Sequence, residues 1–223
     1  MHYVFQFNTV WEHFPELLGG AWLTIQLSAT AMALGLVLAL LCSYGQSAGP
    51  KPVRAVIQAY IELIRNTPFL VQIFIIYFSL PIIGLRLTAN TAALLAMTVN
   101  LGAYACEIVR AGIEAIPRGQ VEAARALGLK RLQIFRFVIL FPALKTVYPA
   151  LSSQFILLML GSSVVSTISA VELTAITNSL QSTTFRSFEF YFVATGIYFA
   201  MSLGFRGALS AIYWAVFQRG RAA

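Results

Sequence analysis

The stretch EAARALG at residues 122–128, followed by FP at residues 141–142, decides how this chain is organised. Residues 122–127 strongly favour a helix, and Gly128 stands where a helix would end with a left-handed residue. A second helix is predicted over 130–138, with three apolar side chains on one face at i, i+3 and i+7: Leu132, Phe135 and Ile139. Helix, glycine turn and helix together predict a compact knob that seats in a groove of a partner. An ordinary loop held by lipid headgroups is the alternative interpretation.

The composition on both sides of this segment is that of a membrane protein. Hydrophobic residues make up 59% of the chain and charged residues only 10%, with mean hydropathy +0.79. A soluble domain carries roughly a quarter charged residues, and a spanning helix needs about 20 apolar ones. Five apolar runs meet or approach that length: 17–50, 69–85, 87–106, 146–171 and 190–205. We therefore expect an all-α membrane protein with about five transmembrane helices, forming a single domain over 1–223.

The boundaries of these helices follow from turn and breaker residues. The five spans are predicted over 20–43, from 53 to about 83, 89–115, 142–163 and 188–217, the last ending in Arg219-Gly220-Arg221. Pro68 removes a backbone donor, so the second span should kink or restart at residues 65–68. A short helix over 170–180 is expected to lie near the outer surface.

The net charge of +7 is distributed unevenly between the two sides of the predicted membrane domain. With the N-terminus outside, all of the 15 Lys and Arg residues except Arg86 and Arg186 fall on the inner side or near it. Positive charge accumulates on the cytoplasmic side of membrane proteins. The basic balance therefore indicates topology, with a cytoplasmic C-terminus, and does not indicate nucleic-acid binding.

The order of motifs resembles the permease subunits of bacterial ABC importers, in particular the polar amino-acid uptake family. Glu122-Ala123-Ala124, Gly128 and the ILFP at 139–142 resemble the EAA loop, with Phe141 in place of the usual leucine. RNTPFLVQ at 65–72, GAYACEIVRAGI at 102–113 and PRGQ at 117–120 resemble further segments of the same family. The resemblance implies the type I importer fold, also called MetI-like, in a multi-pass protein of the bacterial inner membrane.

The resemblance also implies a role for the central segment. The EAA loop, at about 115–136, would be a coupling helix that seats in a cytoplasmic ATPase subunit. Glu122 and Arg125 would make polar contacts, Ala123 and Ala124 would pack closely, and Gly128 would form the turn. The chain has no G-x-x-x-x-G-K-[ST] loop, so ATP and Mg²⁺ are expected in a partner and none in this non-catalytic chain. The expected partners are an ATPase dimer, a second permease and an external solute-binding protein.

Polar residues inside the predicted spans are candidates for a translocation path, because such residues are costly in a bilayer. Glu107 and Arg110 lie at i, i+3 and can bridge each other, as a structural pair or as a gate. Asn100, Tyr104 and Gln154 could line a polar cavity, or could form hydrogen bonds between helices.

One departure from the family pattern bears on the substrate. Many amino-acid permeases carry a lysine-aspartate pair at the positions of Leu160 and Gly161, and this chain lacks both charges. Three explanations stay open: another solute, a site supplied by a paired permease, or a plain passage lined by Ser162, Ser163 and Ser166. We favour a heteromeric pair of permeases.

Two further expectations concern the outer side and the rival classes of protein. Glu172, within the Ser/Thr-rich stretch 166–187, would face the binding protein or belong to an ordinary solvated loop. A self-contained channel or ion-driven carrier would need no ATPase, but five spans without inverted repeats fit carriers poorly. An intramembrane enzyme would need a convergent set of nucleophile, base or metal ligands, which the sequence does not show.

Overall fold

The computed structural model describes residues 3–218, and every regular element in that range is helical. Four helical stretches are long and apolar enough to cross a membrane: Phe14–Ala48 (α2), Ala89–Glu114 (α5), Arg131–Ile168 and Ser187–Gln218. The last two include α8 (Phe141–Gly161) and α10 (Ser187–Tyr213), extended by shorter helical turns. A bent pair, Lys51–Arg65 (α3) and Phe69–Ile83, makes a fifth span if it is counted as one. The prediction of about five spans is confirmed, whereas Arg219 and Arg221 lie outside the described residues.

The remaining elements are short. Asn8–Glu12 (α1) precedes the first span, and Phe69–Phe74 (α4), Ile75–Ser79 (η1) and Leu80–Ile83 (η2) form the second half of the bent pair. The segment between α5 and α8 contains Arg118–Ala126 (α6), Arg131–Gln133 (α7) and Ile134–Leu140 (η3). Between α8 and α10 lie Ser162–Ile168 (η4) and Leu173–Thr184 (α9), and Trp214–Gln218 (η5) follows α10.

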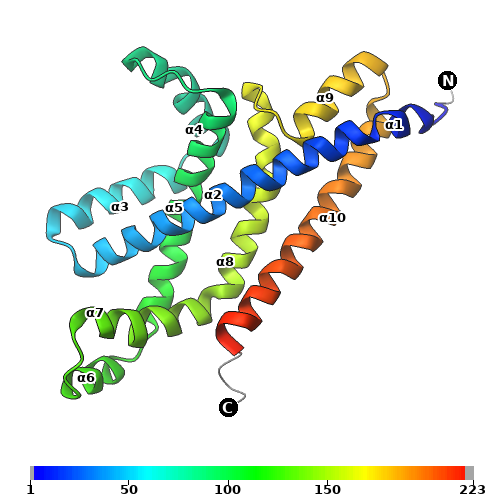
Figure 1. Ribbon diagram of the computed structural model, residues 1–223. Coiled ribbons are helices and arrows are strands. Elements are labelled where there is room, and N and C mark those ends of the chain that lie inside the picture. Colours follow the sequence, from blue (N-terminus) through cyan, green and yellow to red (C-terminus); the bar gives the residue numbers. More distant parts are fainter. Residues whose placement is uncertain (1–2, 219–223) are drawn as a thin grey trace.

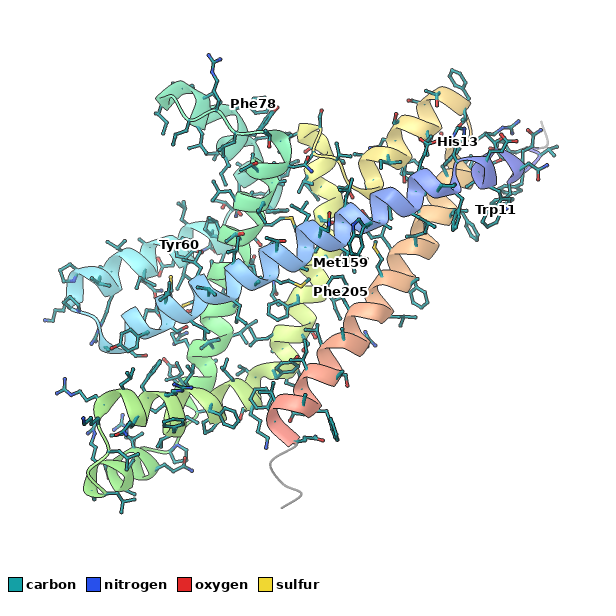
Figure 2. All side chains as sticks on the ribbon, viewed as in Figure 1. Trp11, His13, Tyr60, Phe78, Met159 and Phe205 are labelled. Carbon is teal, nitrogen blue, oxygen red and sulfur yellow. The ribbon has the colours of Figure 1, made fainter. Side chains whose placement is uncertain are left out.

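The core of the fold is the crossing of α2 and α5, which is visible at the centre of Figure 1. Close approach is possible because glycines face the partner helix on both sides. A Cβ atom on Gly102 would lie 2.6 Å from Leu38 Cδ2, and one on Gly35 would lie 2.8 Å from Leu101 Cδ2. From α3, the hydroxyl of Tyr60 donates a 2.6 Å hydrogen bond to the carbonyl of Val99 in α5 (Figure 2).

The predicted interruption at Pro68 is confirmed as a bend of 112° between α3 and the helical stretch that begins at Phe69. Predicted bounds also hold for α5, which ends one residue before the expected position. The first span is longer than the predicted 20–43, because Pro15 suits the first turn of a helix and the helix ends only before Gly49-Pro50.

Figure 1 shows two ends of the molecule. One end, which we call the coupling end, carries α6, α7 and the last turns of α10. The opposite end, the distal end, carries α1, α9 and the first turns of α10. The spans therefore hold the central segment and the Ser/Thr-rich stretch far apart.

Coupling segment and candidate translocation path

The central segment folds as the sequence predicts, into a helix, a glycine turn and a second helix. Gly128 has φ +76°, a left-handed conformation, and open space surrounds the position where its Cβ would lie. The turn is closed by the N–H of Leu129 on the carbonyl of Ala124 at 3.2 Å and by the N–H of Gly128 on that of Arg125 at 2.9 Å. This pair of bonds is the Schellman closure of a helix C-terminus. Gly128 is thus required by backbone conformation and not by lack of space.

The side chains of α6 divide into an outward and an inward set. Glu122 and Ala123 are exposed, whereas Ala124 is only 5% exposed and packs inward. Arg125 is exposed but borders two cavities beside η3. Leu127 is 80% exposed at the tip, an apolar surface residue that the sequence analysis did not single out. Its position directly before Gly128, where a helix end is expected, is the sequence feature that could have identified it.

The knob is connected closely to the membrane helices. Helix α5 ends at Glu114, and only Ala115–Pro117 separate it from α6. Near this end a Cβ on Gly112 would lie 2.7 Å from Val147 Cγ1 and 3.0 Å from the carbonyl oxygen of Ala143, both in α8. Helices α5 and α8 therefore touch through backbone next to the knob. Helix α6 therefore begins close to the place where α5 and α8 touch.

An ion cluster lies on the same half of α5. Glu107 accepts hydrogen bonds from Arg110 at 2.9 and 3.0 Å, which confirms that the two can pair. Arg65 of α3 also donates to Glu107 at 3.1 Å and lies over the ring of Tyr104, 5.6 Å from its centroid. Arg110 bonds further to Glu114 at 2.5 Å. The cluster ties the end of α3 to α5 and satisfies charges that a bilayer would otherwise penalise.

Asn100 belongs to a second polar network, which is buried. Its Nδ2 donates to Gln72 Oε1 at 2.9 Å. Gln72 in turn donates to the carbonyls of Ile64 at 2.7 Å and Thr67 at 3.0 Å. Asn100 thus makes a hydrogen bond between helices, the second of the two roles considered for it. Gln72 is part of the RNTPFLVQ motif, but the sequence analysis did not identify it as the residue that donates to the free carbonyl groups at the break near Pro68.

The candidate residues on α8 and η4 differ in exposure. Leu160 is 39% exposed, and a Cβ on Gly161 would meet no atom within 4 Å, so the positions that lack the family's charges face open space. Gln154 and Ser163 are partly exposed. Ser162 is fully buried and its hydroxyl donates to the carbonyl of Met159 at 2.7 Å. The candidates on α8 and η4 therefore range from fully buried to partly exposed.

Glu172 is not a surface residue, and the expectation that it faces solvent or a binding protein was wrong. It is fully buried at the start of α9, where it accepts the N–H of Ala175 at 2.8 Å and the hydroxyl of Tyr198 at 2.7 Å. Burial raises the pKa of this carboxyl above its ordinary value. Its position as a helix N-cap explains the contact with Ala175.

Within residues 3–218, no group of three His, Cys or Glu side chains is arranged to hold a metal ion. The two cysteines, Cys42 and Cys106, are both free.

Membrane-spanning helices that carry an exposed helical knob at one end are typical of a membrane transport component. Comparison with known families identifies the kind of transport component. Residues 26–213 match the family "Binding-protein-dependent transport system inner membrane component", and the chain belongs to that family. It is accordingly a multi-pass inner-membrane permease subunit of an ABC importer, a transport protein and not an enzyme, in a class that works with an ATPase and a binding protein.

Three named permease proteins are similar to this chain over most of its length. The chain is 35% identical to the glutamine transport system permease protein GlnP of Escherichia coli (strain K12) over 201 residues, which cover 89% of this chain and 92% of the relative. It is 34% identical to the octopine transport system permease protein OccM of Rhizobium meliloti, with 95% and 90% covered. The L-cystine transport system permease protein TcyB of Bacillus subtilis (strain 168) is 38% identical, with 71% and 68% covered.

Solved structures agree with the fold. A crystal structure of an amino acid ABC transporter with histidines matches with a TM-score of 0.85 and 37% identity, covering 95% of this chain and 99% of that chain. An inward-facing structure of the MetNI methionine ABC transporter matches with a TM-score of 0.75 at 23% identity, covering 91% of this chain and 96% of that chain, and supports the fold alone.

Proposed function

We propose that this chain moves a polar amino acid or a related solute into the cell, driven by ATP that a partner ATPase binds with Mg²⁺. The amino-acid class is supported by the names of the relatives, whose substrates are glutamine, octopine and cystine. The coupling end would face the cytoplasm and the N-terminus the outside, because all Lys and Arg residues except Arg86 and Arg186 favour that orientation.

The observation that carries the coupling role is the short connection between an exposed knob and the membrane helix α5. Helix α6 presents Glu122 and Ala123 outward while Ala124 is buried beneath them. Only contacts that differ between two states can shift a conformational equilibrium. The knob follows the end of α5 after Ala115–Pro117, and α5 touches the backbone of α8 at Gly112 near that end, so a movement of the knob can reach both helices. Glu122, Arg125 and Leu127 would touch the ATPase.

The test is ATP-driven uptake by the assembled transporter in vesicles. Glu122→Arg and Gly128→Pro should each abolish uptake, the first by reversing a contact charge and the second because Pro cannot adopt φ +76°. Gly128→Asn should retain most uptake, because Asn tolerates the left-handed conformation. Glu12→Arg, an exposed change at the distal end, should leave uptake unchanged. Full uptake by Glu122→Arg and Gly128→Pro would exclude the coupling role.

The membrane partner is proposed to be a paralogous permease. Leu160 and Gly161 face open space without the charges found there in many amino-acid permeases, so a paired chain would supply them. Asn100, Tyr104, Glu107, Gln154, Ser162 and Ser163 would then line or support this chain's half of the path. Mass spectrometry of the purified complex decides the point, because a homodimer would show this chain as the only permease subunit.

A further inference from the structure

A cavity of about 790 Å³ lies at the coupling end, on the membrane side of the knob. Its walls come from the end of α2, the start of α3, helix α6 and the segment of α7 and η3. The cavity is separate from the candidate path, because no path candidate lines it.

One part of the cavity lining is strongly basic. Arg54, Arg125 and Arg131 contribute to it from three different elements, and no glutamate lines it. Across residues 3–218, none of the three arginines has a carboxylate within ion-pair distance. Arg54 uses its Nε to bond the carbonyl of Gly49 at 2.8 Å, which leaves its two terminal nitrogens for another ligand. Three uncompensated guanidinium groups around one cavity favour a bound anion, and their planar forks suit phosphate.

The rest of the lining is apolar. Leu132, Phe135 and Ile139, the three residues predicted to share one helix face, all border the cavity. Tyr44 of α2 meets Phe135 edge-on, with ring centroids 5.1 Å apart. A small inorganic anion would leave this apolar surface uncovered, whereas hydrocarbon attached to the anion would cover it.

We propose that the cavity binds an anionic phospholipid, with its headgroup phosphate between the three arginines and its acyl chains along Leu132, Phe135 and Ile139. The cavity lies where α2, a membrane span, reaches its last turns, which is the level at which headgroups are expected. Basic pockets between membrane helices are suited to acidic lipid headgroups. The lipid would join the hairpin of α2 and α3 to the coupling helix.

The experiment compares lipid retention by two matched double variants of the assembled transporter. The pocket variant is Arg54→Gln with Arg131→Gln. The control is Lys51→Gln with Arg136→Gln, which removes the same charge from the same end but from residues outside the cavity lining. Arg125 is left unchanged because it belongs to the coupling helix. Each complex is reconstituted in vesicles of phosphatidylcholine and phosphatidylglycerol, extracted in neutral detergent, and analysed for bound lipid by native mass spectrometry.

The unmodified and control complexes should retain phosphatidylglycerol in preference to phosphatidylcholine, and the pocket variant should lose that preference by about tenfold or more. Equal loss in the control would show diffuse surface attraction and overturn the site, as would the absence of any preference in the unmodified complex. Inorganic phosphate distinguishes the other source of the anion. If it displaced phosphatidylglycerol at millimolar concentration and stabilised the detergent-solubilised protein equally, the ligand would be a free phosphate and the lipid assignment would be wrong.

Discussion

Helices α5 and α10 both carry enough apolar sequence to cross a membrane, but the protein uses them differently. In an apolar 18-residue segment of α5, 61% of the residues are buried, against 22% in an equally long apolar segment of Ser187–Gln218, which contains α10. Helix α5 packs against α2, α3, α4 and α8, whereas α10 packs mainly on α8 and α9. Similar hydropathy therefore does not imply a similar environment. One helix organises the fold of this chain, and the other offers most of its surface to lipid or to another subunit.

The exposed side of α10 includes one wall of an apolar groove of about 1010 Å³ shared with α1 and α2. Gly196 and Gly204 lie in that wall, and no atom lies within 4 Å of the position of either missing Cβ. In α5, by contrast, the glycines are in contact with neighbouring side chains. The comparison can be tested by changing equivalent residues in the two helices.

The largest difference is expected from glycine substitutions. Gly102→Leu in α5 should lower the free energy of unfolding by about 3 kcal/mol, because even a Cβ would lie 2.6 Å from Leu38. Gly204→Leu in α10 should change it by less than about 0.5 kcal/mol, since its surroundings are open. Denaturant titration of the protein in mixed micelles measures both. Equal effects would mean that the two helices are not packed differently.

An intermediate effect is expected where α10 is anchored. Glu189 is fully buried in its first turn and accepts the hydroxyl of Tyr3 at 2.5 Å and the N–H of Gln6 at 2.9 Å. Glu189→Ala should cost about 2 kcal/mol, because it removes two hydrogen bonds that a buried carboxylate accepts. Glu12→Ala, an exposed change nearby, serves as the control in the same titration. A negligible effect of Glu189→Ala would show that α10 is not held at this end.

The smallest effect is expected in the way the free energy of unfolding depends on pH. Tyr198 of α10 donates to the buried carboxyl of Glu172, whose pKa is raised by burial. The cost of burying the charged form is present above this raised pKa and is relieved as the pH falls toward the ordinary value of 4.5. As the pH falls through this range, the free energy of unfolding of the unmodified protein should therefore rise relative to that of Glu172→Gln. Parallel stability curves for the two proteins would contradict this assignment.

Much of the architecture follows from sequence, because the signals involved are local. The span of α5 is bounded by turn residues, the break at Pro68 follows from its missing donor, and the turn at Gly128 follows from its conformation. The face that each span presents is harder to predict. Membrane helices are apolar on all sides, so hydropathy does not separate a lipid-facing side from a protein-facing one.

The misjudged position of Glu172 has a related cause. Glu172 was expected at the surface because it lies in the Ser/Thr-rich stretch 166–187, but its carboxyl caps α9 inside the protein. Glu172 and Asn100 both have hydrogen-bond partners far away in the chain: Tyr198 lies 26 residues from Glu172, and Gln72 lies 28 residues from Asn100. Local patterns carry no information about such pairs.

The break at Pro68 also has a consequence for how the chain enters the bilayer during synthesis. In lipid, each backbone carbonyl without a donor costs several kcal/mol. The carbonyls of Ile64 and Thr67 at the break are satisfied by Gln72, and the remaining amide oxygen of Gln72 accepts from Asn100. Asn100 is made after Gln72 and belongs to the next span. The second span can thus complete its hydrogen bonding only when α5 lies beside it, so the two should be integrated as a pair.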